Sequence, residues 1–457
     1  VGREDIPADF LVAEGVEKSI TISGKNVPLA VYAQGTNGLV YEQMIIDLPV
    51  FTESEQELLP LYTSMVSELG AGDNDYMAMQ QWQSRVSGGL RMSLSVRTDL
   101  HDAKKGLGHL VLSGKALADK AQDFSQLMQA TLDGLRFDEG SRVRELISQM
   151  RARWEASVTG QGHGLAMQTA SSAFSVVAAF NQHISGLPGI RRIKALDAAL
   201  ADDSALKGLL SDLQGLHRKV QQSQRRFLLI GEEERLSALE SSLQLTWQDR
   251  PWQPQTDSFA FKTPGAAQNV GWLCNTQVQF CARAFPAVPV EHTDAPALML
   301  LGGFLRNGFL HNAIREKGGA YGGGAGYDGN ACAFRFYSYR DPRLTDTLKD
   351  FDASIDWLLN EPHEQRQLEE TLLGIISDMD KPLSPSGEAR QAYHNALYGR
   401  THEQRKRLRE RLLGVSLSDL LRVGETWLTK GNACTAVVAP NAKLAEVEAL
   451  GLTIEKL

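Results

Sequence analysis

The sequence contains few cysteines and lacks long apolar runs. Its 457 residues include 4 cysteines, which are Cys274, Cys281, Cys332 and Cys434. No two of them have the Cys-x-x-Cys spacing. We interpret them as buried thiols of a reducing compartment, because neither a disulfide framework nor a metal knuckle fits this pattern. No apolar run approaches the ~18 residues that a membrane span needs, so no membrane partner is expected.

The sequence also lacks an excess of positive charge. It has 47 Lys and Arg against 55 Asp and Glu, a formal net charge of −8. This balance argues against a nucleic-acid partner. The chain begins at Val1 with no initiator methionine and no signal-peptide pattern, which we interpret as a fragment, a processed chain or a trimmed form. We expect a cytoplasmic protein, or one of the mitochondrial matrix or a plastid if the source is eukaryotic.

The most unusual stretch is rich in glycine and runs from Arg315 to Pro342. An apolar segment of helical spacing precedes it, and Gly318 and Gly319 would supply the left-handed cap that ends this helix. Residues 331–339 alternate as a strand does, and Asp341 with Pro342 predicts the start of another helix. The expected order is therefore helix, glycine-rich turn, strand and helix.

Within this stretch, residues 324–329 match the pattern G-x-G-x-x-G. A dinucleotide site needs that pattern after a strand and at the start of a helix. Here it follows an expected helix and leads into an expected strand, which is the wrong context for such a site. The alternative of a nucleotide-binding oxidoreductase therefore rests only on these misplaced glycines. We interpret the glycines as a place where another backbone approaches closely, because no side chain stands in the way.

Arg315 and Tyr321 flank the expected turn, so both side chains can point towards one spot. A guanidinium and a phenol both donate hydrogen bonds, and such donors suit a carbonyl oxygen that gains negative charge. A purely structural interpretation is also open, in which Arg315 complements the helix C-terminus and Tyr321 packs. The residues alone do not decide between these interpretations.

Two motifs together resemble the C-terminal half of the insulinase/pitrilysin zinc metallopeptidases, and most closely the presequence-protease branch. They are Arg315-x-x-Gly318-Gly319-Ala320-Tyr321-Gly322 and Ser338-Tyr339-Arg340-Asp341-Pro342. The resemblance implies that Arg315 and Tyr321 reach across a closed chamber to a zinc site in the N-terminal half. There they would hold the substrate carbonyl and stabilise the tetrahedral intermediate. It also implies that substrate contacts Gly318, Gly319, Ala320 and Gly322.

The sequence departs from that family in its histidines. The zinc site of the family needs His-x-x-Glu-His and a later Glu, and none of the 10 histidines has this spacing or that of His-Glu-x-x-His. His163 and His183 lack a ligand partner at metal spacing and are interpreted as structural. This chain is therefore expected to hold no metal and to be inactive alone.

The resemblance implies the C-terminal half of a zinc-dependent metalloendopeptidase that degrades unfolded peptides. Its partners would be peptide substrates and an N-terminal half that binds the zinc. The rival interpretation is a non-catalytic structural or regulatory subunit of the same fold.

A second Gly-Gly motif indicates an internal repeat. Arg85-Val86-Ser87-Gly88-Gly89-Leu90 matches the start of the glycine-rich stretch, and the expected elements around both follow the same order. We therefore expect an α+β fold of insulinase-like architecture, with two homologous domains that are each a mainly antiparallel sheet with helices on one face. The domains would be residues 1–249, a linker at 250–267, and residues 268–457 with Arg315 and Tyr321. The first has Arg91 in place of the tyrosine, and we interpret it as the non-catalytic copy.

Overall fold

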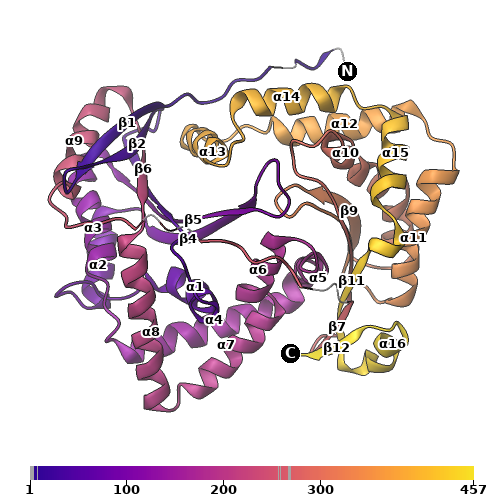
Figure 1. Cartoon of the computed structure of the whole chain (residues 1–457), viewed down its shortest axis with the longest axis horizontal. Coiled ribbons are helices and arrows are strands. Elements are labelled where there is room, and N and C mark those ends of the chain that lie inside the picture. Colours follow the sequence, from indigo (N-terminus) through magenta and orange to yellow (C-terminus); the bar gives the residue numbers. More distant parts are fainter. Residues whose placement is uncertain (1–4, 8, 256, 258, 266–268) are drawn as a thin grey trace.

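The computed structural model describes residues 5–7, 9–255, 257, 259–265 and 269–457. The start of the chain at Val1, parts of the expected linker and residue 268 lie outside these residues. The described chain forms two six-stranded sheets with helices packed on them, one sheet in each half of the molecule (Figure 1). None of its helices is long and apolar enough to cross a membrane.

The first sheet has the strand order β1-β2-β6-β3-β5-β4, and the second has the order β12-β7-β11-β8-β10-β9. Neighbouring strands are antiparallel except for β2 with β6, β7 with β11 and β7 with β12, which are parallel. The strands of the first sheet are β1 Val16–Ile22, β2 Lys25–Ala33, β3 Leu39–Asp47, β4 Leu90–Thr98, β5 Gly106–Leu117 and β6 Arg225–Gly231. Those of the second are β7 Val270–Cys274, β8 Phe280–Pro286, β9 Gly322–Asp328, β10 Ala333–Tyr339, β11 Cys434–Pro440 and β12 Thr453–Lys456.

Helices occupy most of the remaining chain. Those of the first half are α1 Glu53–Met65, α2 Tyr76–Val86, α3 Ala121–Asp133, α4 Gly140–Gly160, α5 Gly162–Ser171, α6 Val176–Ser185, α7 Leu187–Ala199, α8 Asp203–Gln222 and α9 Leu236–Trp247. Those of the second half are α10 Ala295–Leu305, a π-helix at Arg306–Lys317, α11 Thr345–Asn360, α12 Gln365–Met379, α13 Pro385–Leu397, α14 His402–Leu413, α15 Leu417–Trp427 and α16 Leu444–Ala449. Short 3-10 turns are at Ala118–Lys120, Glu233–Arg235, Lys430–Asn432 and Asn441–Lys443.

The two halves share one topology, strand for strand. The order β2-β6-β3-β5-β4 of the first sheet corresponds to β7-β11-β8-β10-β9 of the second, and only the outermost strands β1 and β12 differ. In each half a parallel pair joins the first and last strands of the common unit, β2 with β6 and β7 with β11. The expected α+β fold with two related units is therefore confirmed.

The main cores lie between each sheet and the helices of its own half. In the first half, Phe124 and Met128 of α3 are fully buried in one cluster with Met44 and Leu112 of the sheet. In the second half, α10 and α11 pack in the same way on β8 and β10. Burial of such large side chains contributes about 1.5–3 kcal/mol each.

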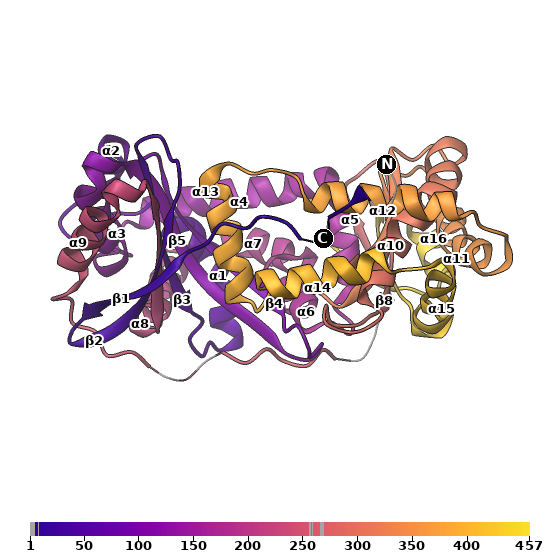
Figure 2. The ribbon, with the colours of Figure 1, turned by 90° about the horizontal axis from the view of Figure 1, so that it is seen from above.

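The opposite face of each sheet receives a helix from the other half. Helix α5 contacts β8, β10 and β11, and the hydroxyl of its Ser171 accepts a hydrogen bond of 2.9 Å from the Arg335 side chain. Helix α13 packs its Ala389 and Ala392 on the first sheet. Figure 2 shows α13 and α14 in the space between the two halves. Each half thus contributes a helix to the sheet of the other half. The expected domain boundaries at residues 249 and 268 therefore remain a prediction.

Candidate functional site

The helix before the Gly-Gly motif changes its winding along its length. Helix α10 continues directly into a π-helix of 12 residues that ends at Lys317. Gly319 then takes the left-handed conformation with φ +79°, and its N–H donates to the carbonyl of Arg315 at 3.1 Å. The expected left-handed cap is confirmed at Gly319, whereas Gly318 keeps the right-handed φ of −82°. π-helical turns are rare and are frequent at functional sites.

The glycine-rich segment after the cap is a strand, so the expected turn is wrong. Strand β9 pairs antiparallel with β10 over its whole length and forms the edge of the second sheet. The close backbone approach is confirmed: a Cβ added at Gly302 of α10 would lie 2.6 Å from the Cα of Gly326. The G-x-G-x-x-G pattern therefore lies in an edge strand under a helix, which is not the context of a dinucleotide site.

Arg315 and Tyr321 are both exposed at this end of the second sheet. Arg315 lies in the last turn of the π-helix, and Tyr321, just before β9, is 69% exposed. Within the described chain, no hydrogen bond or ion pair engages the guanidinium of Arg315 or the hydroxyl of Tyr321. The donors of both side chains are therefore free to bind a ligand.

The four residues expected to contact substrate differ in their exposure. Gly319 is exposed and Gly322 is half-buried, whereas Gly318 and Ala320 are buried. A side chain at Gly318 would overlap the guanidinium of Arg343, which donates to the carboxylate of Asp350 at 2.9 Å. Substrate contact by these four residues stays a prediction, and only Gly319 and Gly322 offer accessible backbone.

The second motif positions the end of β10 through two buried polar side chains. The Ser338 hydroxyl accepts from the N–H of Cys281 at 3.3 Å. The Asp341 carboxylate accepts from the N–H of Arg343 at 2.9 Å and from the hydroxyl of Thr347 at 2.6 Å. Asp341 was expected to be the N-cap of the next helix, and this is wrong, because α11 begins at Thr345. Its carboxylate instead links the turn that precedes α11 to the first turn of that helix.

A row of rings leads from Tyr321 towards α5. Tyr321 contacts Tyr339 at a centroid distance of 5.6 Å, Tyr339 contacts His163 at 4.8 Å, and His163 contacts Tyr337 at 5.5 Å. Burial lowers the pKa of His163, and its Nδ1 has no hydrogen-bond partner among the described residues. Sequence reasoning did not place His163 here, because the exchange of α5 between the halves has no local sequence signal.

Neither the cysteines nor the carboxylates of the described chain form a metal site. No group of three or more His, Cys, Asp and Glu residues is placed there to hold a metal ion. All four cysteines are free and buried, as expected. Burial raises the pKa of Cys274 to about 11, so its thiol stays protonated at neutral pH. A catalytic zinc therefore does not fit these residues.

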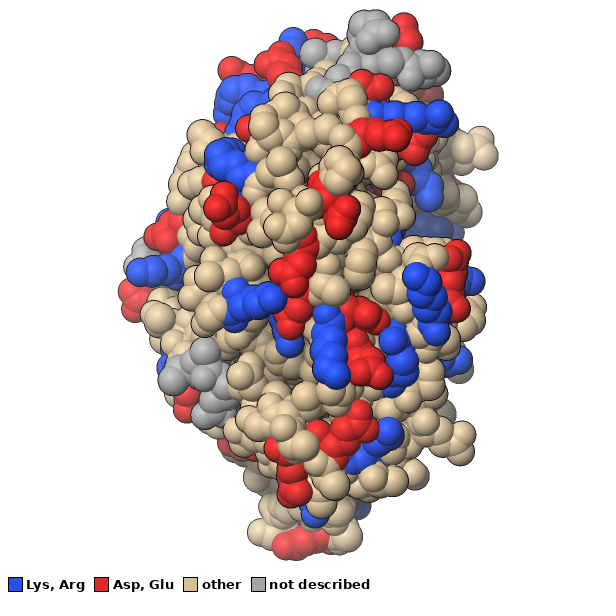
Figure 3. All heavy atoms as spheres, turned by 90° about the vertical axis from the view of Figure 1, so that its right-hand side faces the viewer, with Lys and Arg blue, Asp and Glu red and all other residues tan. Residues whose placement is uncertain are grey.

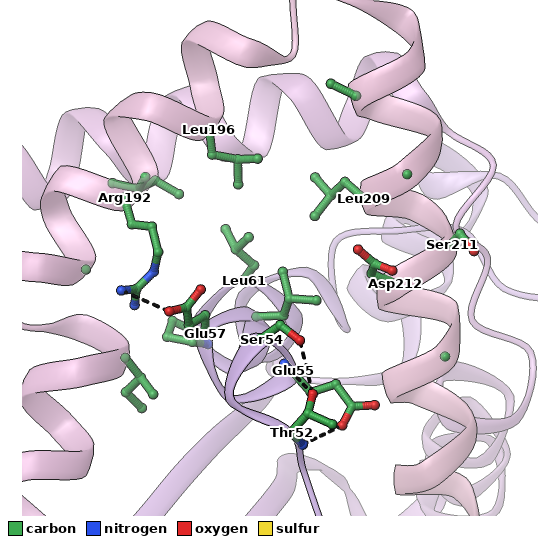
Figure 4. A pocket seen from close by; sticks show the side chains of 18 of the residues that line it. Thr52, Ser54, Glu55, Glu57, Leu61, Arg192, Leu196, Leu209, Ser211 and Asp212 are labelled. Carbon is green, nitrogen blue, oxygen red and sulfur yellow. Dashed lines mark hydrogen bonds and ion pairs between the residues drawn. The ribbon is translucent and has the colours of Figure 1, made fainter.

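A cavity of about 590 Å³ lies elsewhere, among the helices of the first half (Figure 4). Leucines of α1, α7 and α8 line it, and at one side Glu57 pairs with Arg192 at 3.4 Å and with His183 at 3.5 Å. None of the residues expected to act on substrate lines this cavity.

On the outer face of the second half, Lys and Arg side chains are interspersed with Asp and Glu side chains (Figure 3).

Family models match most of the chain. Residues 1–196 match the model for the region associated with peptidases of family M16, subfamily C, and residues 274–439 match the PreP C-terminal domain. The mitochondrial presequence protease of Kluyveromyces lactis is 29% identical over 392 residues, which are 84% of this chain and 39% of that protein. The chain thus spans about two fifths of the length of the curated relatives it matches.

Solved structures share the fold at low sequence identity. Pitrilysin matches with a TM-score of 0.65 at 14% identity, over 99% of this chain and 47% of its own. The M16 peptidase inactive domain from Pseudomonas fluorescens matches with a TM-score of 0.62 at 15% identity, over 94% of this chain and 98% of its own.

Proposed function

Because the chain belongs to the presequence-protease family of M16 peptidases and matches its C-terminal part, we propose that it is the C-terminal half of a zinc-dependent metalloendopeptidase. The substrates are unfolded peptides. The N-terminal half of the same protein is its partner and binds the zinc, and this chain alone is inactive. The observation that supports this role is the pair of exposed, unengaged donors Arg315 and Tyr321 at one end of the second sheet.

In this proposal, Arg315 and Tyr321 donate hydrogen bonds to the oxygen of the scissile carbonyl. That oxygen gains negative charge as the tetrahedral intermediate forms, so the donors bind the transition state more strongly than the ground state. The cap at Gly319 separates the two residues by a tight turn. Accessible backbone at Gly319 and Gly322 allows a peptide to approach without meeting a side chain.

The rival function is a non-catalytic structural or regulatory subunit. The fold shared with an M16 inactive domain favours it. The proposed location is the cytoplasm, or the mitochondrial matrix or a plastid in a eukaryotic source; the Kluyveromyces lactis relative is named as mitochondrial.

A reconstitution experiment separates the two functions. Cleavage of an unfolded peptide is measured with this chain alone, with the N-terminal half alone, and with the two combined, each with its zinc content determined. We expect turnover only in the combined sample and zinc only in the N-terminal half. If the N-terminal half cleaved the peptide equally well with and without this chain, the proposal would be contradicted. That result would favour a non-catalytic structural or regulatory subunit.

A further inference from the structure

A polar pocket lies beside the Gly-Gly motif of the first half. It has a volume of about 520 Å³ and is formed where β3, β4 and β5 meet the first turn of α13. Gly88 and Gly89 border it, and Gly89 has a φ of +110°, as Gly319 has a positive φ in the second half. Arg91 follows these glycines at the position that Tyr321 has after Gly318 and Gly319. The first half therefore presents a guanidinium at the sequence position where the second half presents a phenol.

The lining of this pocket is cationic. Arg91 from β4, Lys115 from β5 and Arg390 from α13 contribute to it, and no Asp or Glu is among the described residues that line it. In the described chain, no hydrogen bond or ion pair engages the side chain of Arg91 or of Lys115. Like charges in one pocket raise one another's electrostatic energy, and an anion relieves this repulsion.

The geometry around the cations also suits an anion. The first turn of α13, with Ser384 as its N-cap, contributes its positive end to the pocket. Arg390 donates its Nε–H to the carbonyl of Ser386 at 3.2 Å, which holds the guanidinium beside this turn and leaves its terminal N–H groups available. Lys115 lies over Gly88, where an added Cβ would be 2.9 Å from its Cε.

The pocket is held in shape by the docking of α13 on the first sheet. The side chains of His394 and Gln43 form a hydrogen bond of 2.7 Å, and Arg97 donates to Asn395 at 3.4 Å. The walls of the pocket therefore come from two halves of the chain that are already packed together. A preformed site binds its ligand at a lower entropic cost than one that must first be ordered.

We propose that this pocket is an oxyanion site, in which Arg91 and Arg390 hold a carboxylate or phosphate group and Lys115 adds charge. Guanidinium groups match the planar geometry of carboxylates and can bind them through two parallel hydrogen bonds. If the chain is half of a peptidase, as proposed above, the ligand is the C-terminal carboxylate of a peptide substrate. The other source of the same chemistry is free phosphate.

Binding to the isolated chain tests the proposal. Fluorescence anisotropy is measured with a labelled unstructured peptide that ends in a free carboxylate, and with the same peptide amidated at its C-terminus. We expect the free acid to bind about 10-fold more tightly, since a charge-assisted hydrogen bond of about 1.5 kcal/mol corresponds to this ratio. Inorganic phosphate should compete with the free acid.

The Arg91→Gln variant should remove the preference for the free acid, and Arg91→Lys should restore part of it. Arg218→Gln is the matched control, because Arg218 is exposed on α8 and outside the pocket, and it should keep the preference. Unchanged thermal unfolding of all variants is expected, because Arg91 is exposed.

The outcomes assign the ligand or overturn the site. Equal binding of the two peptides, with phosphate binding that is lost in Arg91→Gln, would assign the site to free phosphate. If the preference for the free-acid peptide, or the binding of phosphate, were unchanged in Arg91→Gln, the proposal would be overturned. It would also be overturned if the wild-type chain showed neither the preference nor phosphate binding. The assay needs no turnover, so its failure leaves the proposed peptidase role intact.

Discussion

The rings of Tyr321 and Tyr339 meet edge to face, with centroids 5.6 Å apart and an interplanar angle of 78°. This contact orients a side chain whose hydroxyl has no partner among the described residues. The direction of the phenol is therefore set by ring packing, and its O–H remains available for a ligand.

Replacement of Tyr321 by Phe separates the hydroxyl from the ring. The variant keeps the contact with Tyr339 and loses the donor. In the protein assembled with its N-terminal half, we expect turnover to fall ~100- to 1000-fold, as when one oxyanion donor is removed. The thermal unfolding midpoint should not change, because Tyr321 is 69% exposed. Tyr337→Phe is the matched control in the same row of rings, and wild-type turnover in Tyr321→Phe would remove this residue from the mechanism.

Replacement of Gly319 by Ala tests the cap. Gly319 has a φ of +79°, which costs an L-residue roughly 1–2 kcal/mol. Gly319→Ala should lower the free energy of unfolding by about this amount, measured by urea denaturation. Gly322→Ala is the control, since a Cβ there meets nothing within 4 Å, and its stability should match that of the wild type. Equal stability of the two variants would show that the positive φ is not required.

Replacement of Gly302 by Ala tests the close approach of α10 to β9. The added Cβ would meet the backbone of Gly326, which cannot move aside as a flexible side chain can. We expect a loss of roughly 1–3 kcal/mol in the free energy of unfolding, as for an overpacked interior. In Gly374→Ala, on the exposed part of α12 with nothing within 4 Å of the Cβ, stability should rise by up to about 1 kcal/mol. A gain in both variants would contradict the packing described for β9.

Glu42 should make stability depend on pH. Burial raises the pKa of its carboxyl from 4.5 to about 7, although the hydrogen bond from Ser125 opposes this shift. The folded state therefore keeps a proton that the unfolded chain releases at lower pH. The contribution of Glu42 to stability is full below pH 4.5, falls as pH rises from 4.5 to about 7, and then stays level. Glu42→Gln should flatten this part of the curve in urea denaturation at several pH values, and an unchanged slope would contradict the assignment.

The sequence predicted the features that depend on local chemistry. The left-handed cap follows from two adjacent glycines after a helical pattern, and the internal repeat follows from the shared Gly-Gly motif. The strand at residues 322–328 was missed because glycine has a low preference for strands, and here pairing with β10 and the contact with α10 outweigh that preference. The π-helix was missed because its hydrogen bonds leave no distinct spacing in the sequence.

The misplaced start of α11 has a similar origin. Asp341 followed by Pro342 satisfies the rules for a helix start, yet its carboxylate accepts hydrogen bonds from Arg343, before the helix, and from Thr347, in the first turn of α11. His163 reaches the site only because α5 packs on the sheet of the other half, and such a long-range contact is invisible in a local pattern.

The reciprocal placement of α5 and α13 has a consequence for how this molecule can be divided. Cutting the connection between the sheets and isolating either piece would uncover apolar surface, namely Phe280 and Trp272 on one side and Tyr32 and Ile45 on the other. Each piece keeps the core between its sheet and its own helices, but one face of each sheet is shielded from solvent only by the other half.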